Sequence, residues 1–177
     1  MPKRLKSLSS EVLHTNPWWV YKRDTYTLPS GKTGEYYYAE TSGFSMIVPV
    51  LPDGRVVLVL QHRYLSDKQS IEFPAGAVDG DKNVLAAAQR ELREETGYLS
   101  DMWRKIGVFH GSKSMIKNNI AHIFLAHVSS CSTQELDETE EIGILFRTPQ
   151  EVDTMIRDGS IWDGSTIAAW YLVRPSV

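Results

Sequence analysis

The sequence predicts a mixed α/β fold of the α+β kind, in which a mixed β-sheet carries helices on its faces. Runs rich in Val, Ile, Tyr and Trp, separated by turn signals, predict strands through the first half of the chain. Capped helical segments are expected at three later places, and strands and helices do not alternate regularly, as they would in a βαβ chain. With 177 residues, the chain is long enough for one domain with a core and a small arm.

The first part of the chain is expected to form an N-terminal arm with a β-hairpin. Residues 1–17 are polar and end at a proline, so we interpret them as irregular or partly helical. Two stretches rich in Tyr, Trp and Thr follow, and Pro29-Ser30-Gly31-Lys32 between them is a turn signal. We therefore assign residues 1–42 to the arm and hairpin, and residues 43–177 to the main domain.

The main domain is expected to begin with a second hairpin, since two apolar runs flank Pro52-Asp53-Gly54. A short strand follows in SIEFPAG, and Asn83 can cap a helix over residues 84–96 that ends at Gly97. The remaining elements, in order, are strands near 103–109, 120–127 and 141–146, then helices at 149–157, with proline in the first turn, and at about 165–173.

Composition excludes several classes of function. The net charge of −3 argues against nucleic acid as the main partner, because such surfaces are usually basic. The N-terminus has no apolar core of signal-peptide length, and no run approaches the ~18 apolar residues of a membrane span. The single cysteine, Cys131, cannot form an intrachain disulfide, and we interpret it as an incidental thiol. We expect a soluble cytoplasmic protein that binds neither membrane nor nucleic acid.

Three glutamates on the helix over residues 84–96 point to chemistry. Glu91, Glu94 and Glu95 lie at positions i, i+3 and i+4, and so share one helical face on which like charges repel. Gly76 and Gly80 in front of the helix permit a tight turn with backbone carbonyls free for a ligand. Carboxylate and carbonyl oxygens suit a hard cation such as Mg²⁺ or Mn²⁺. The alternative is a solvated acidic face without a ligand.

The segment from Gly76 to Tyr98 resembles the Nudix box, G-x5-E-x7-R-E-U-x-E-E-x-G-U, where U is a bulky apolar residue. Gly76 matches the first glycine, and the second half matches without a gap through Arg90, Glu91, Leu92, Glu94, Glu95, Gly97 and Tyr98. One position departs, because Lys82 replaces the first glutamate, which in this family mostly supports the loop. Asp79 and Asp81 are candidates to replace it.

The resemblance implies hydrolysis of a nucleoside diphosphate linked to another group X, on an α/β/α sandwich around a mixed sheet. It also implies Mg²⁺ or Mn²⁺ held by Glu91 and Glu95, with Glu94 close by and the carbonyl of Ala75 contributing. The metals would neutralise pyrophosphate charge and lower the pKa of a bound water, and a carboxylate would remove its proton.

Outside the box, QHRYLSDKQSIEFPAG resembles the ADP-ribose and nucleoside diphosphate sugar pyrophosphatases. In that subfamily the arginine at the position of Arg63 contacts the substrate near the diphosphate, and Glu72 matches another position near the substrate. A guanidinium suits phosphate oxygens because it donates in a fork. The alternatives are a surface arginine at a strand end and a strand carboxylate paired with it.

The resemblance further implies a homodimer that exchanges the N-terminal hairpin, with aromatic side chains of the hairpin stacked on the adenine. Trp18, Trp19 and Tyr36 lie in the matching region, and which of them would face a base stays open. These rings could equally form a dimer core. The catalytic base is expected in the late acidic loop, with Glu138 and Glu141 as first choices and Glu140 behind them. Lys113 and Ser112 are further candidates to contact the sugar phosphate.

The leading hypothesis is a divalent-metal-dependent pyrophosphatase that converts ADP-ribose, or a related nucleoside diphosphate sugar, to AMP and a sugar phosphate. One alternative is the same fold acting on another nucleoside diphosphate derivative, such as GDP-mannose or a dinucleoside polyphosphate. The other is a Nudix module that binds a nucleotide without hydrolysing it, which would require broken metal ligands.

Overall fold

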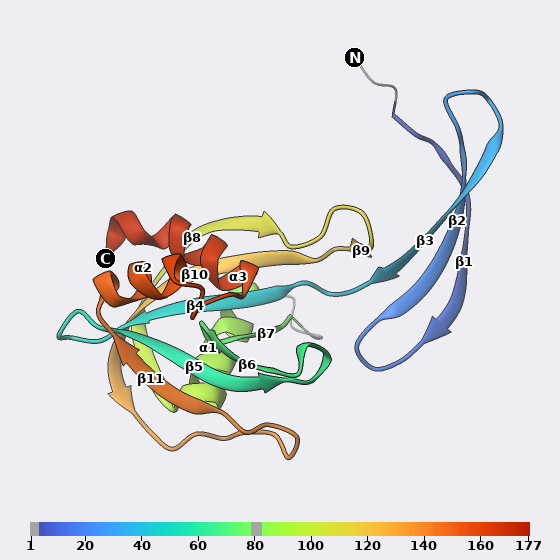
Figure 1. Ribbon diagram of the computed structural model, residues 1–177. Coiled ribbons are helices and arrows are strands. Elements are labelled where there is room, and N and C mark those ends of the chain that lie inside the picture. Colours follow the sequence, from blue (N-terminus) through green and yellow to red (C-terminus); the bar gives the residue numbers. More distant parts are fainter. Residues whose placement is uncertain (1–3, 79–82) are drawn as a thin grey trace. The chain divides into compact units, whose positions relative to one another are not determined.

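The computed structural model describes residues 4–78 and 83–177 (Figure 1). The chain divides into two compact units, each of which combines segments distant in the sequence. Unit 1 comprises Met1–Gly43 and His110–Ile120, and unit 2 comprises Phe44–Phe109 and Ala121–Val177. The sequence analysis had placed residues 110–120 in the main domain, whereas they pack with the arm.

Unit 1 is a four-stranded sheet in the order β1-β2-β3-β9. The predicted hairpin is present as an antiparallel pair around a turn in which Gly31 has a φ of 84°. The short strand β9 pairs in parallel with β3 and ties residues 110–120 to the arm. The strands are β1 (Ser7–Thr15), β2 (Val20–Thr27), β3 (Thr33–Glu40) and β9 (Ile116–Lys117).

Strand β1 corrects one prediction, since residues 1–17 were expected to be irregular or partly helical. Ser7–Thr15 forms a strand antiparallel to β2, and all nine of its residues are exposed. Polar pairs across the two strands support the pairing: Ser9 Oγ lies 2.6 Å from Thr25 Oγ1, and Arg23 Nη2 lies 2.6 Å from Glu11 Oε2. The strand conformation therefore comes from pairing with β2, because the polar sequence carries little strand preference of its own.

Unit 2 is built on a seven-stranded mixed sheet. Its strands run in the order β11-β5-β4-β10-β8, with β6 added beside β5 and β7 beside β4. The pairing of β4 with β10 is parallel, and the other pairs of β4 and β5 are antiparallel. The strands are β4 (Phe44–Val50), β5 (Val56–Arg63), β6 (Lys68–Glu72), β7 (Ala75–Ala77), β8 (Tyr98–His110), β10 (Ile120–Cys131) and β11 (Gly143–Arg147).

Helices cover both faces of this sheet (Figure 1). On one face, α1 packs Ala88 and Leu92 against Ile47 of β4 and Phe124 of β10. On the other face, α2 and α3 enclose the larger core, which includes Val152 and Trp170. The helices are α1 (Val84–Thr96), α2 (Pro149–Arg157), α3 (Gly164–Val173) and the short 3₁₀ turns η1 (Tyr64–Ser66) and η2 (Arg174–Ser176). The predicted α/β/α sandwich with a mixed sheet is confirmed.

Candidate active site

The local sequence fixes where helix α1, which carries the three glutamates, begins and ends. Asn83 caps the helix by accepting a hydrogen bond from the backbone N–H of Leu85 at 2.9 Å, and Gly97 ends it in a left-handed conformation with a φ of 71°. Ala87, Ala88 and Leu92 of the same helix are buried. Small alanines let the helix lie close to the sheet, so the acidic residues beside them are carried inward as well.

Glu91 and Glu95 are buried rather than solvated. Their exposed fractions are 8% and 5%. Burial raises the pKa of both carboxyl groups, and the pKa of Glu95 reaches about 8, with the negative charge of Glu91 as the second cause. The interpretation as a solvated acidic face is therefore wrong for these two residues. Glu94, between them in sequence, is only partly buried.

Strand β7 lies directly against the two buried carboxylates. The backbone N–H of Ala75 donates a hydrogen bond to Glu95 Oε2 at 3.0 Å. Gly76 is so close to Glu91 that a Cβ atom there would lie 2.1 Å from its carboxyl carbon and Oε1. Glycine is therefore needed at position 76 because of a side chain on α1, and β7 brings the backbone of Ala75 to the acidic cluster.

Arg90 supplies positive charge to the same cluster. Its Nη1 lies 2.7 Å from Glu91 Oε1 and 2.9 Å from Glu94 Oε2, and its Nη2 donates to the carbonyl of Ala77 at 3.1 Å. Within residues 4–78 and 83–177, no three Asp, Glu, His or Cys side chains are arranged around one point as a ready metal site. A cation held by Glu91 and Glu95 would compete with Arg90 for Glu91.

The chemistry of the donor set nevertheless fits a hard divalent cation. Two carboxylates one helical turn apart are held in a buried position, where Glu91 pairs with Arg90 and Glu95 accepts from the N–H of Ala75. Carboxylates are the ligands that such cations prefer. Lys82, which departs from the box, lies outside the described residues, as do Asp79, Gly80 and Asp81.

The late acidic loop is attached to the C-terminal end of α1. Gln134 Nε2 donates to the carbonyl of Glu95 at 2.6 Å, and the N–H of Glu135 donates to the carbonyl of Glu94 at 3.0 Å. The charge of Glu140 contributes to the raised pKa of both Glu91 and Glu95. Glu138, Glu140 and Glu141 are all exposed, and no hydrogen bond joins any of these three side chains to α1 in the described part of the chain.

Arg63 and Glu72 form an ion pair beside this cluster. Arg63 Nε donates to Glu72 Oε1 at 2.7 Å, and Nη2 donates to Oε2. Glu72 is buried, whereas 46% of the Arg63 side chain is exposed. Its Nη1 makes no hydrogen bond to the described residues, so it remains able to donate to a ligand. The positive charge of Arg63 lowers the pKa of Glu95, but burial raises that pKa by more.

A cavity of about 260 Å³ connects the ion pair with β7. Its lining includes Arg63 and Glu72 as well as Ala75 and Gly76 of β7. Asp163 also lines it, and it was missed in the sequence analysis. Its Oδ2 accepts a hydrogen bond from the N–H of Thr166 at 2.7 Å, so it is the N-cap of α3. An aspartate before a helical segment is the signal by which it could have been found.

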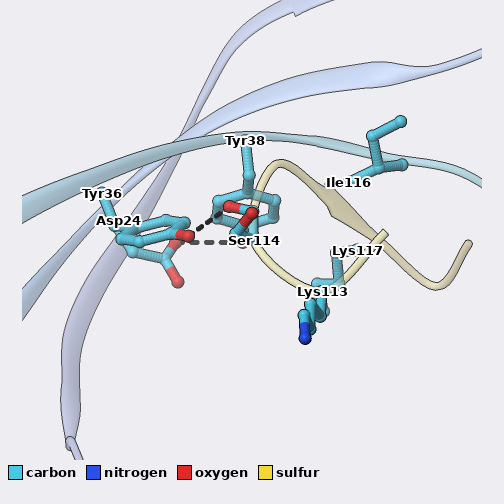
Figure 2. Close-up of a pocket in the computed structure, with 7 residues that line it drawn as sticks. All are labelled: Asp24, Tyr36, Tyr38, Lys113, Ser114, Ile116 and Lys117. Atoms are coloured by element: carbon cyan, nitrogen blue, oxygen red, sulfur yellow. Dashed lines mark hydrogen bonds between the residues drawn. The ribbon is translucent and has the colours of Figure 1, made fainter. Parts of the chain in front are cut away.

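The predicted base-binding aromatics all lie in unit 1. Trp18 and Trp19 are exposed, and their backbone N–H groups donate to Asn16 Oδ1 at 2.9 Å each. Tyr36 instead lines a pocket of about 320 Å³, with Lys113 on its rim, and neither tryptophan is among the lining residues (Figure 2).

The pocket of Tyr36 also contains residues that the sequence analysis missed. Figure 2 shows Tyr38 hydrogen-bonded to Asp24, with 3.1 Å between the phenolic oxygen and Oδ1, and Tyr36 donating to the carbonyl of Ser114. Lys117 lies over the Tyr38 ring, 5.8 Å from its centroid. The missing signal was the pairing of β3 with β9, which brings residues 113–117 to the hairpin.

A comparison with protein families decides the classification. Residues 41–170 match the NUDIX domain. The chain belongs to the Nudix family. The match includes α1, β7, Arg63 and the late loop, so the resemblance inferred from the box is confirmed over most of the chain. Members of this family generally depend on a divalent metal, which agrees with the donor set described above.

Individual relatives agree with this classification. An ADP-ribose pyrophosphatase of Bacillus subtilis is 29% identical over 144 residues, which cover 80% of this chain and 77% of that protein. An ADP-ribose pyrophosphatase of Mycobacterium tuberculosis is 35% identical over 101 residues, 56% of this chain and 48% of that protein. A crystal structure of an ADP compounds hydrolase superposes with a TM-score of 0.83 over 98% of this chain and 94% of the other. At 20% identity it shows the fold alone.

None of the described helices is long and apolar enough to cross a membrane.

Proposed function

We propose that this Nudix protein hydrolyses the diphosphate bond of ADP-ribose or a related nucleoside diphosphate sugar, giving AMP and a sugar phosphate. One observation carries the proposal: two buried carboxylates lie against β7, and β7 lines a cavity together with Arg63, whose Nη1 makes no hydrogen bond to the described residues. A buried anionic pair suits a cation, and the exposed guanidinium suits phosphate. The names of the relatives support this class of substrate.

We infer that the cation is Mg²⁺, or Mn²⁺ in its place. Glu91 and Glu95 would be its carboxylate ligands, with the carbonyl of Ala75 as backbone ligand and Glu94 as a nearby further carboxylate. When bound, the metal would neutralise charge on the diphosphate and lower the pKa of a water molecule. The raised pKa values of Glu91 and Glu95 support this assignment, because a cation would relieve the cost of ionising both.

Arg63 is proposed to orient the diphosphate. Its Nε and Nη2 are held by Glu72, which fixes the plane of the guanidinium, and its free Nη1 can donate to a phosphate oxygen. Glu72 then acts as a positioning residue. Glu72 would then both pair with Arg63 and lie beside the substrate, as the two interpretations of this residue expect.

A glutamate of the late loop is proposed to take the proton from the attacking water. Glu140 is the best candidate, because its charge contributes to the raised pKa of Glu91 and Glu95. A hydrogen bond from the N–H of Asp137 to its Oε2, at 3.1 Å, restrains the side chain. Glu138, Glu141 and Glu94 remain the other candidates.

Unit 1 is proposed to bind the base and to join two copies of the chain. Trp18, Trp19 and Tyr36 offer aromatic faces for stacking. Strand β1 exposes Leu8 and Val12 along a strand with no buried residue, and such apolar exposure favours a partner surface. A second copy of this chain is the partner that the family resemblance implies.

The experiment that tests the proposal is a panel of nucleoside diphosphate derivatives, incubated with the protein and Mg²⁺ and analysed by chromatography. The expected products from ADP-ribose are AMP and ribose 5-phosphate. Faster cleavage of GDP-mannose or of a dinucleoside polyphosphate would assign the site to that substrate instead. Tight binding of ADP-ribose without any product would show a binding module and contradict the proposed hydrolysis.

A further inference from the structure

The aspartate Asp163 lines two neighbouring cavities of unit 2. The cavity of about 260 Å³ beside β7 and a second cavity of about 460 Å³ are both lined by Arg63, Glu72 and Asp163. Every residue that lines either cavity belongs to unit 2. A ligand held by Arg63 would therefore lie beside Asp163.

The fold holds Asp163 in place from both sides along the chain. Before it, Trp162 Nε1 donates to the carbonyl of Gln69 at 3.0 Å. After it, Thr166 is fully buried, and its Oγ1 accepts a hydrogen bond from the backbone N–H of Phe73 at 3.4 Å. The Asp163 side chain is itself restrained, because its Oδ2 accepts from the N–H of Thr166 at 2.7 Å. A group fixed in this way loses little freedom when a ligand binds.

The cap of α3 uses one of the two carboxylate oxygens of Asp163. The other oxygen, Oδ1, accepts no hydrogen bond from the residues that the structure describes. The hydrogen bond to Glu72 is the main cause of the raised pKa of Arg63, and the charge of Asp163 contributes to it. Oδ1 is therefore a charged hydrogen-bond acceptor near the guanidinium that a ligand can use.

Capping alone does not account for a carboxylate at this position. Serine and asparagine cap a helix as well as aspartate does and carry no charge, and α1 of this chain is capped by Asn83. A negative charge beside a diphosphate is unfavourable, because like charges repel. The carboxylate is favourable there if it accepts hydrogen bonds from the ligand, since charge-assisted hydrogen bonds are the stronger kind. In the proposed substrates the group next to each phosphate is a sugar, whose donors are hydroxyl groups.

We propose that Asp163 accepts hydrogen bonds from hydroxyl groups of a ribose next to the diphosphate, and so selects substrates with a sugar at that place. The proposal rests on the proposed function, which places the diphosphate at Arg63. ADP-ribose has a ribose on either side of its diphosphate, and both offer the same hydroxyl chemistry to Oδ1. Ser165 supplies a further hydroxyl group to the cavity beside β7. Asp163 is then a specificity-determining residue and takes no part in the chemical step.

Two analogues of ADP-ribose test the proposal and locate the hydroxyl groups. The 2′,3′-dideoxyadenosine analogue lacks the hydroxyls of the nucleoside ribose, and the tetrahydrofurfuryl ester of ADP carries as X a ribose ring without hydroxyls. For the wild-type protein, kcat/KM on one of the two should be lower than on ADP-ribose by about tenfold or more, mainly through KM. The reason is the loss of a hydrogen bond to a charged acceptor. The analogue with the larger loss identifies the ribose that Asp163 contacts.

Asp163→Ser separates the role in the fold from the contact with the ligand, because serine keeps the cap of α3 and removes the second oxygen. In this variant kcat/KM for ADP-ribose should fall by about tenfold, to within about twofold of the value for the affected analogue, while the melting temperature stays unchanged. Thr148→Ser is the matched change at the N-cap of α2. Thr148 lines neither cavity, so this control should keep the wild-type preference.

A wild-type protein that cleaves all three compounds equally well would overturn the proposal. An Asp163→Ser variant that loses activity equally on all three, or on none, would also overturn it, because the preference for hydroxyl groups would then not depend on Asp163. If the wild-type protein cleaves none of the three, the proposed function fails. Calorimetric binding of the same compounds then tests Asp163: a preference for ADP-ribose that Asp163→Ser loses supports its role, and a retained or absent preference refutes it.

Discussion

The two units depart from ordinary burial in opposite directions. Unit 2 buries the carboxylates of Glu72, Glu91 and Glu95, whereas unit 1 exposes large apolar side chains along β1 and around Trp18. Buried charge is costly unless a counter-charge is present, and exposed apolar surface is costly unless it is covered. We therefore propose that unit 2 binds a cation at its buried carboxylates and that unit 1 packs its exposed apolar side chains against a second surface.

The difference also shows in how each unit is stabilised. Both core clusters are made of unit 2 residues, and Tyr38 is the one hydrophobic residue of unit 1 that is buried among the described residues. A sheet with so little core of its own depends on contacts with something else. Unit 2 has a hydrophobic core of its own. Its buried carboxylates Glu91 and Glu95 lie on α1, against β7. We expect substitutions in unit 2 to affect chemistry and substitutions in unit 1 to affect assembly.

The largest effect is expected for Glu95→Gln. The change removes a proposed metal-ligand charge with little change in shape, so kcat should fall by about a hundredfold or more while circular dichroism stays unchanged. Glu135→Gln in the exposed late loop is the control and should retain activity, because among the described residues its carboxylate pairs with Arg93 alone, at 3.4 Å. Near-normal turnover of Glu95→Gln in Mg²⁺ would break the metal assignment.

Gly76→Ala should weaken Mg²⁺ binding by about tenfold or more, measured by calorimetry, because ligand orientation tunes metal affinity. The new Cβ would lie 2.1 Å from atoms of the Glu91 carboxyl group and would push it aside. Gly164→Ala at the start of α3 is the control, since a Cβ there meets no atom within 4 Å. Equal Mg²⁺ affinity in both variants would show that the packing of β7 against Glu91 does not shape the site.

The combined change Leu8→Lys and Val12→Lys should sharpen the contrast by acting on assembly alone. Two charges on the exposed face of β1 should raise the dimer dissociation constant by about tenfold or more, seen by analytical ultracentrifugation. Met102→Lys on β8 of unit 2 introduces the same charge at another exposed site and should leave the oligomeric state unchanged. A wild-type chain that is monomeric at high concentration would contradict the proposed role of the arm.

The smallest effect is expected in the pH dependence of stability without metal. Glu95 is protonated more readily in the folded state, where its pKa is about 8 against an ordinary value of 4.5. The folded state therefore binds more protons than the unfolded state between these pH values, so the free energy of unfolding should fall as the pH rises from about 5 to 8. Thermal melts in EDTA should show a decline of several degrees, and Glu95→Gln should largely abolish it. A melting temperature that rises over this range would refute the burial of Glu95.

Local signals made most of unit 2 predictable. The bounds of α1 and α2 follow from their caps: Asn83 and Gly97 for α1, and for α2 the capping box of Thr148 and Glu151 with Pro149. These signals act within a few residues, so a single sequence contains them. Unit 1 was less predictable, because β1 is a strand only through its pairing with β2, and residues 110–120 join the arm through a two-residue ladder with β3.

The candidate site was predictable in its composition but not in its geometry. Helical spacing places Glu91, Glu94 and Glu95 on one face and treats them alike. The structure separates them, because β7 covers Glu91 and Glu95 and leaves Glu94 partly exposed. In the late loop, an irregular backbone gives no periodicity, so the position of Glu140 relative to α1 could not be inferred from spacing.

The most direct test is anomalous diffraction from crystals soaked in Mn²⁺ with a non-cleavable nucleoside diphosphate sugar. Our account predicts a manganese peak within coordination distance of the Glu91 and Glu95 carboxylates and of the Ala75 carbonyl, with Arg90 moved off Glu91. A well-ordered ligand at Arg63 with no manganese at these two carboxylates, or with both carboxylates turned to solvent, would contradict it.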